Sequence, residues 1–91
     1  MALLIDPANF AARDRWWCHL VSDTSFAELH DFARSAGIPE RAFHRDHYDI
    51  PAEQRQAIVD AGATEVTSRD LVRRITAAGL RRPKHLHEYP C

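Results

Sequence analysis

Short apolar runs alternate along the chain with amphipathic stretches and polar breaks. The first run, Leu3-Leu4-Ile5, ends at Asp6-Pro7. Proline favours extended backbone before it and interrupts a strand ladder after it, so we predict a first strand at residues 3–5. Residues 7–24 show little periodicity and are predicted to form a long loop, of the kind that often carries function.

Three later stretches carry apolar residues at helical spacing, and each is followed by a glycine that suits a left-handed C-terminal cap. Each also begins with residues suited to a helix N-terminus, such as Ser25 with Glu28, which form a capping box. The predicted helices cover residues 26–36, 52–61 and, starting from a cap at Thr67 or Ser68, residues up to 78.

Two more strands are predicted between these helices. Residues 42–50 are rich in Phe, His and Tyr, and residues 63–66 are predicted to form a brief third strand. The order β-α-β-α-β-α with short turns after the helices favours an α/β fold with a small three-stranded parallel sheet and a long first βα loop. Such a sheet has open edges, so we expect the first loop to cover one edge or a homodimer to pair it.

Size and composition limit the function classes. The 91 residues, 45% hydrophobic and 27% charged, suit one domain at residues 1–80, followed by a basic tail at 81–91 that we expect to be flexible. The net charge of -1 gives no overall attraction to nucleic acid or to an anionic membrane surface. Nucleic acid could bind only locally, through the basic tail. The N-terminal apolar run is too short for a signal peptide or a membrane span, and we expect a cytoplasmic protein.

Ligands of open parallel sheets bind beyond the carboxyl ends of the strands. The predicted topology therefore gathers ionisable residues there, with Asp23 and other polar residues of the first loop as a wall. The residues expected to bind a ligand are Asp6, Arg15, His19, Arg45, Tyr48, Asp49, Ser68 and Arg69.

Within residues 44–49, extended backbone would point alternate side chains to opposite faces. One face would carry His44, Asp46 and Tyr48, and the other Arg45, His47 and Asp49. Both groups can serve one pocket only if the strand ends inside this segment. Neutral imidazoles and carboxylates bind zinc, manganese or iron, so we predict a divalent metal on His44, Asp46 and His47, although their spacing matches no established motif.

Three alternatives remain open for this cluster. It is a catalytic site, in which His44 or His47 is the general base and Asp23 or Asp49 orients it. It is a phosphate or nucleotide pocket, in which arginines grip oxygens in bidentate fashion. Otherwise it is structural, in a non-enzymatic domain that binds another protein or dimerises.

Four strings stand out together: HLVSDT at 19–24, ELH at 28–30, FHRDHYD at 43–49 and SRDLV at 68–72. With them the chain resembles a small bacterial and phage family, domain of unknown function 4031. The resemblance covers about residues 2–82, and it implies a bacterial or viral source but no mechanism.

Because the ionisable residues are predicted to gather at one end of the sheet, we expect a module that binds or hydrolyses a phosphate-bearing small molecule or nucleotide at the carboxyl ends of the strands. A divalent metal is the candidate cofactor.

Overall fold

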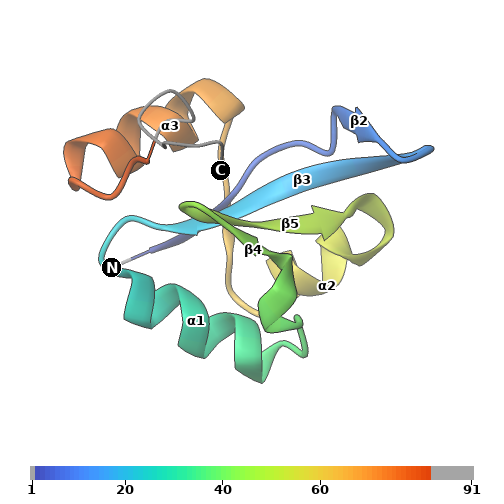
Figure 1. Cartoon of the computed structure of the whole chain (residues 1–91), viewed down its shortest axis with the longest axis horizontal. Coiled ribbons are helices and arrows are strands. Elements are labelled where there is room, and N and C mark those ends of the chain that lie inside the picture. The colour runs from blue at the N-terminus through green and yellow to red at the C-terminus, as the bar shows by residue number, and fades with distance from the viewer. Residues whose placement is uncertain (1, 83–91) are drawn as a thin grey trace.

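The computed structural model of the chain describes residues 2–82, which form a mixed sheet flanked by helices (Figure 1). The strands are β1 (Leu3–Ile5), β2 (Phe10–Ala12), β3 (Arg15–Ser22), β4 (Phe43–His44), β5 (His47–Pro51) and β6 (Thr64–Glu65). The α-helices are α1 (Phe26–Ser35), α2 (Arg55–Asp60) and α3 (Ser68–Ala77), and the short 3-10 helices are η1 (Glu40–Ala42) and η2 (Ala52–Gln54). The strand order is β4-β5-β3-β1-β6, with β2 paired to β3.

The mixed α/β class is confirmed, but the predicted three-stranded parallel sheet is wrong. Only β1 and β6 run parallel, while every other paired set of strands in residues 2–82 is antiparallel. The sheet differs because residues 7–24 are not a loop. They form the β2–β3 hairpin, and β3 runs between β1 and β5.

The pattern of β3 explains why it was not recognised. Cys18 and Leu20 point to one face and are fully buried, while Trp17, His19 and Val21 share the other face, where only Val21 is fully buried. A strand with apolar residues on both faces and a histidine among them lacks the polar and apolar alternation of a half-exposed strand.

The segment at 42–50 also differs from the prediction of one strand. It is the β4–β5 hairpin, which reverses direction at Arg45, a residue with a positive φ of 59°. The amide of Asp46 donates to the carbonyl of His44 at 2.7 Å, which closes a three-residue turn. The predicted helix at 52–61 is η2 followed by α2, and the strand predicted at 63–66 is shortened to β6.

The other helix predictions are confirmed within one or two residues at each end. The side chain of Ser25 caps α1 by accepting from the amide of Glu28, and Thr67 caps α3 in the same way. Gly37, with a φ of 77°, follows the end of α1 in the left-handed conformation that a helix stop requires.

Helices cover both faces of the sheet unequally. Helices α1 and α2 lie on one face and α3 on the other (Figure 1). The larger core lies beneath α1 and α2, and it includes Leu20 and Ile50 from the sheet. A smaller cluster of Leu4, Val21, Leu71 and Ile75 lies beneath α3. The buried apolar side chains of α3 pack against this cluster, and elsewhere on this face the sheet carries polar side chains, such as His19.

The first two residues of the predicted tail belong to the folded part. The amide of Arg82 and the guanidinium of Arg81 donate to the carboxylate of Asp46 in the β4–β5 turn. The remaining residues of the predicted flexible tail, 83–91, lie outside the described residues. No helix within residues 2–82 has the length and apolar character needed to cross a membrane.

Candidate functional site

A row of polar side chains crosses three strands on the α3 face of the sheet. His19 of β3 is paired directly with Asp49 of β5, and the pairing of Ile5 with Leu20 places Asp6 beside His19 on the other side. Directly paired residues point to the same face. His47 precedes Asp49 by two residues and therefore joins them on this face.

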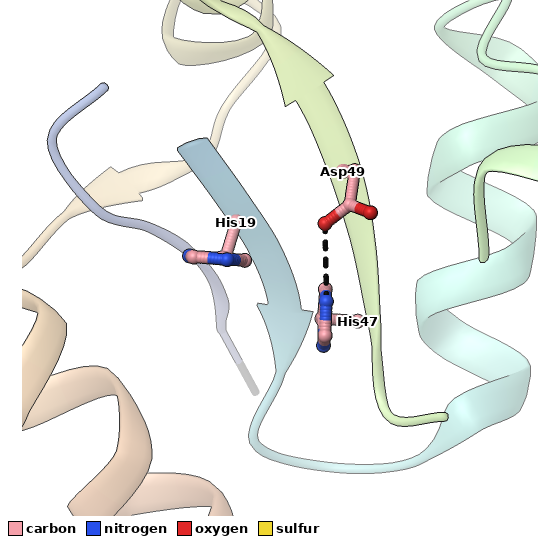
Figure 2. Close-up of side chains that lie close together, drawn as sticks. All are labelled: His19, His47 and Asp49. Atoms are coloured by element: carbon pink, nitrogen blue, oxygen red, sulfur yellow. Dashed lines mark ion pairs between the residues drawn. The ribbon is translucent and has the colours of Figure 1, made fainter. Parts of the chain in front are cut away.

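His19, His47 and Asp49 form the centre of the group, which we call the His-Asp cluster (Figure 2). One ring nitrogen of each histidine and one carboxylate oxygen of Asp49 all lie within 4.8 Å of one another. The two imidazoles meet edge to face with their centroids 4.9 Å apart. Nε2 of His47 lies 3.1 Å from Oδ1 of Asp49.

Each histidine of the cluster is held by a second, buried carboxylate. Nδ1 of His19 lies 3.0 Å from Oδ2 of Asp6, and Nδ1 of His47 lies 2.8 Å from Oδ1 of Asp46. The side chains of Asp6 and Asp46 are only 2% and 1% exposed. An ionised carboxylate accepts a hydrogen bond from the Nδ1–H group of the imidazole. This bond fixes the orientation of the ring and leaves the lone pair on Nε2.

Asp6 is kept ionised by three donors from two elements, β3 and α3. Besides the His19 ring, the amide of His19 donates to Oδ1 at 2.7 Å and the hydroxyl of Ser68 at the start of α3 donates to Oδ2 at 2.7 Å. Burial alone would raise the pKa of Asp6, but these hydrogen bonds stabilise the charged form more strongly and the pKa is lowered.

Asp46 is held in the same way from the C-terminal side of the chain. Its Oδ2 accepts from the amide of Arg82 at 2.7 Å and from the guanidinium of Arg81 at 3.3 Å. Burial opposes ionisation, yet the bonds from His47 and Arg82 outweigh it and lower the pKa of Asp46 to about 2. Asp46 therefore carries its charge at neutral pH.

The contact between Nε2 of His47 and Oδ1 of Asp49 favours a positive charge between these two atoms. Burial lowers the pKa of His47, but Asp46 and Asp49 raise it more, so the net shift is upward. Asp49 shows the reverse, because the interaction with His47 outweighs burial and lowers its pKa. Apart from this contact with His47, no hydrogen bond among residues 2–82 reaches the buried Oδ1 of Asp49. When His47 is neutral with its proton on Nδ1, two lone pairs face each other, and a proton or a metal ion between them removes the repulsion.

A small cavity of 220 Å³ opens beside the cluster, between the sheet and α3. Its polar lining includes His19, His47 and Arg81, and its apolar lining comes from α3 and from Val21 of β3. The volume is below the roughly 300 Å³ at which pockets for drug-sized ligands begin. It suits an ion, water or a single small group.

The structure brings together most of the residues predicted to form the site. Asp6, His19, His47, Asp49 and Ser68 meet as described above, and Asp46 serves as the partner of His47. His44 and Arg45 belong to the same hairpin: His44 pairs with His47, and Arg45 lines the cavity. The strand does end inside residues 44–49, which satisfies the condition for both groups to serve one pocket.

Three other predicted residues lie away from the cluster with partners of their own. Tyr48 points to the opposite face, where its hydroxyl bonds to Nδ1 of His30 at 2.7 Å. Asp23 accepts from the amide of Ala2 and from Arg74, and so ties the N-terminus to α3. Arg15 pairs with Glu53 at an exposed position.

Arg69, the last of the predicted ligand-binding residues, is exposed on α3.

The two arginines that hold Asp46 were not predicted to belong to the site. Arg81 and Arg82 were assigned to a solvated tail, because nothing local in the sequence links them to residues 44–49. The alternation of His47 with Asp49, and the position of His19 between the apolar Cys18 and Leu20, were the local signals for the cluster itself.

Comparisons with curated proteins and with solved structures find no match. A family model described as "Protein of unknown function (DUF4031)" matches residues 3–78, from β1 to the end of α3. The match includes all three members of the His-Asp cluster and both carboxylates behind its histidines. Since it covers most of the sequence, the chain belongs to the DUF4031 family.

Proposed function

We propose that this protein binds a divalent transition-metal ion through His19, His47 and Asp49 and uses it to bind and hydrolyse a phosphate-bearing small molecule. The observation that carries the proposal is the pairing of each histidine Nδ1 with a buried carboxylate. Histidines that bind metals through Nε2 usually have such a partner on the other nitrogen. Two histidines and one carboxylate with open positions form a common metal-binding set.

The spacing of the ligand atoms is close to what a metal ion needs. Zinc binds histidine nitrogen and carboxylate oxygen at about 2.0–2.2 Å, so tetrahedral ligand atoms are about 3.3 Å apart. His47 and Asp49 already have this spacing at 3.1 Å. All three ligand atoms lie within 4.8 Å of one another, and rotation of the side chains around an ion would shorten the longer distances.

The charge around the cluster favours a cation. Asp6, Asp46 and Asp49 bring three carboxylates, against two guanidinium groups at the cavity, that of Arg81, which pairs with Asp46, and that of Arg45. A free phosphate would meet this negative charge and be repelled. A bound divalent ion reverses the local field, so we expect phosphate to bind here only after the metal.

The proposed reaction is hydrolysis of a phosphate ester. A metal ion held by His19, His47 and Asp49 would keep room for water and for a phosphate oxygen, and it would supply an activated water at neutral pH. Hydrolysis would form a bond from the water oxygen to phosphorus and break the bond from phosphorus to the leaving oxygen. One proton of the water would pass through solvent to the leaving oxygen, and the other would stay on the phosphate.

Metal titration of untagged protein tests the proposal. After treatment with a chelator, calorimetry with zinc or manganese should show one ion per chain. His47→Ala should weaken binding by more than about 100-fold, because a lost ligand costs more than the roughly 10- to 100-fold of a lost second-shell partner. The matched control is His30→Ala, which removes a histidine from the opposite face of the sheet.

The second readout is activity toward a generic aryl phosphate. We expect hydrolysis by the metal-loaded protein, and its loss in His47→Ala but not in His30→Ala. Absence of stoichiometric binding, or equal binding by both variants, would overturn the metal site. The cluster would then be structural, as in the alternative of a non-enzymatic interaction or dimerisation domain.

A further inference from the structure

A second and larger cavity, of 610 Å³, lies at the outer edge of β5. The short strand β4 pairs only with His47 and Tyr48. Within residues 2–82, the β5 edge from Asp49 to Pro51 therefore has no strand beyond it, and the space is bounded by η1 and the β2–β3 turn. Its volume falls within the roughly 300–1,000 Å³ of small-molecule sites. We call this cavity the edge pocket.

Two arginines at the edge pocket are available for a ligand. Arg13 comes from the β2–β3 turn and Arg41 from η1, and both are exposed. None of the described residues forms an ion pair with either of them, in contrast to Arg15, which pairs with Glu53. A guanidinium that is free of acidic partners and lines a concave surface is suited to bidentate binding of phosphate.

His44 adds a neutral donor to the edge pocket. Its Nε2 lies 2.7 Å from a guanidinium nitrogen of Arg45, which has only donors, so Nε2 accepts and the proton is on Nδ1. Burial and the charge of Arg45 lower the pKa of His44. The ring therefore supplies an N–H group from Nδ1.

Apart from Asp49 and Gln54, the rest of the lining is apolar or aromatic. It includes Trp17 on β3, Phe43 on β4 and the Ile38–Pro39 segment before η1. The guanidinium of Arg13 lies 4.8 Å from the centre of the Trp17 ring, so charge and aromatic surface are adjacent. A ligand that combines an anion with a flat ring matches both parts of this lining.

Asp49 connects the edge pocket with the His-Asp cluster. It lines the pocket, while its carboxylate belongs to the proposed metal site. We infer that the edge pocket binds a nucleoside monophosphate or a similar ring-bearing phosphate ester, with the phosphate on Arg13 and Arg41 and the ring against Trp17 and Phe43. The inference rests on the proposed function for its role as substrate site, and it places the phosphate on arginines other than Arg15, Arg45 and Arg69.

Tryptophan fluorescence provides a direct assay. The chain has two tryptophans, and Trp16 is 54% exposed on the other side of β3, so Trp16→Phe leaves Trp17 as the only reporter. Adenosine monophosphate, added to the zinc-loaded full chain, should change the Trp17 emission in a saturable way. Inorganic phosphate and adenosine should each bind at least about tenfold more weakly, because each lacks half of the contacts.

Arginine variants locate the site. In the same background, Arg41→Ala should weaken nucleotide binding about tenfold or more, since it removes charged hydrogen bonds. The matched control is Arg69→Ala, which makes the same change on α3 and should leave the affinity unaltered. Calorimetry on each variant checks that zinc binding is retained.

The outcomes separate this inference from the proposed function. Zinc binding with no saturable effect of the nucleotide, or equal effects of Arg41→Ala and Arg69→Ala, would overturn the edge pocket and leave the metal site intact. Equal affinities for phosphate and nucleotide would overturn the ring-bearing ligand. Arg41-dependent nucleotide binding in the presence of chelator, without zinc binding, would support the pocket while the metal site failed.

Discussion

At the residue scale, the site depends on which atoms of each side chain are already engaged. His19 and His47 use Nδ1 for buried carboxylates, so their chemistry is restricted to Nε2. Asp46 was predicted as a metal ligand, but the structure engages both of its oxygens, with His47 on one side and Arg81 and Arg82 on the other. Identity and spacing in the sequence cannot distinguish a ligand from the residue that orients it.

The pair of Asp46 and His47 predicts how stability depends on pH in metal-free protein. The folded pKa of Asp46, about 2, is below its usual 3.8, so its contribution is present above about pH 4 and is lost as the pH falls toward 2. The folded pKa of His47 is raised above 6.5, so its contribution is complete below that pH and is lost as the pH rises through the raised value. The pair should therefore stabilise the fold most between about pH 4 and 6.5.

Asp46→Asn tests this window by denaturation in the presence of a chelator. The difference in unfolding free energy from the parent protein should fall by about 2 kcal/mol between pH 4 and pH 2, and should also decrease above pH 6.5. Asp31→Asn, in an exposed pair with Arg34 on α1, should give a small and nearly constant difference. A constant difference for Asp46→Asn would contradict the assigned charges.

At the element scale, local signals predicted the helices better than the strands. The caps at Ser25 and Thr67 and the glycine after each helix are short-range features, and α1 and α3 begin and end where these features indicate. Strand β3 was missed because its partners, β1 and β5, are distant in sequence, and because both of its faces contact other parts of the fold.

The β2–β3 hairpin offers a prediction about one of these strands. Its two turn residues, Arg13 and Asp14, have positive φ values of 50° and 63°, which matches a type I′ turn. Glycine adopts this conformation without strain, so Asp14→Gly should raise the free energy of unfolding by about 0.5 kcal/mol. Thermal or chemical denaturation measures the effect.

The control for the turn is the same substitution in a helix. Asp31→Gly in α1 should lower stability, because glycine is unfavourable in a helix interior and the pair with Arg34 is lost. If both substitutions destabilised the protein, the β2–β3 turn would not have the positive φ values described above.

At the scale of the whole molecule, the site joins parts from nearly the full length of the described chain. Asp6 follows β1, His19 lies in β3, His47 and Asp49 lie in β5, and Ser68 begins α3. Arg81 and Arg82 then return to the β4–β5 turn after α3 has crossed the face. These two residues are therefore part of the support for the His-Asp cluster.

The backbone amide of Arg82 gives a specific test of this support. Arg82→Pro removes the N–H group that donates to Asp46, whereas Arg82→Ala keeps it and removes only the side chain. A hydrogen bond to a charged group contributes about 1.5–3 kcal/mol, so the proline variant should be less stable than the alanine variant by roughly that amount. It should also bind zinc more weakly, because Asp46 then orients His47 less firmly.

Denaturation and zinc calorimetry on the two variants provide the measurements. Both variants lose the guanidinium of Arg82 and its contact with the Phe26 ring. The difference between the two variants therefore reports on the backbone amide. Equal stability and equal zinc affinity would show that the C-terminal segment does not support the cluster.

The sequence by itself determined the mixed class, the first strand, the helix caps and the identity of the polar residues at 44–49, because each depends on backbone hydrogen bonds or periodicity within a few neighbouring residues. Only the tertiary structure decided the direction of the strands, and with it the pairing of His19 with Asp49. The predicted meeting point at the ends of parallel strands was wrong, yet Asp6, His19 and Asp49 still meet, side by side across three strands. The physical reason is that strand pairing is settled by which apolar faces the helices can bury together, a property of the whole chain and not of any short segment of it.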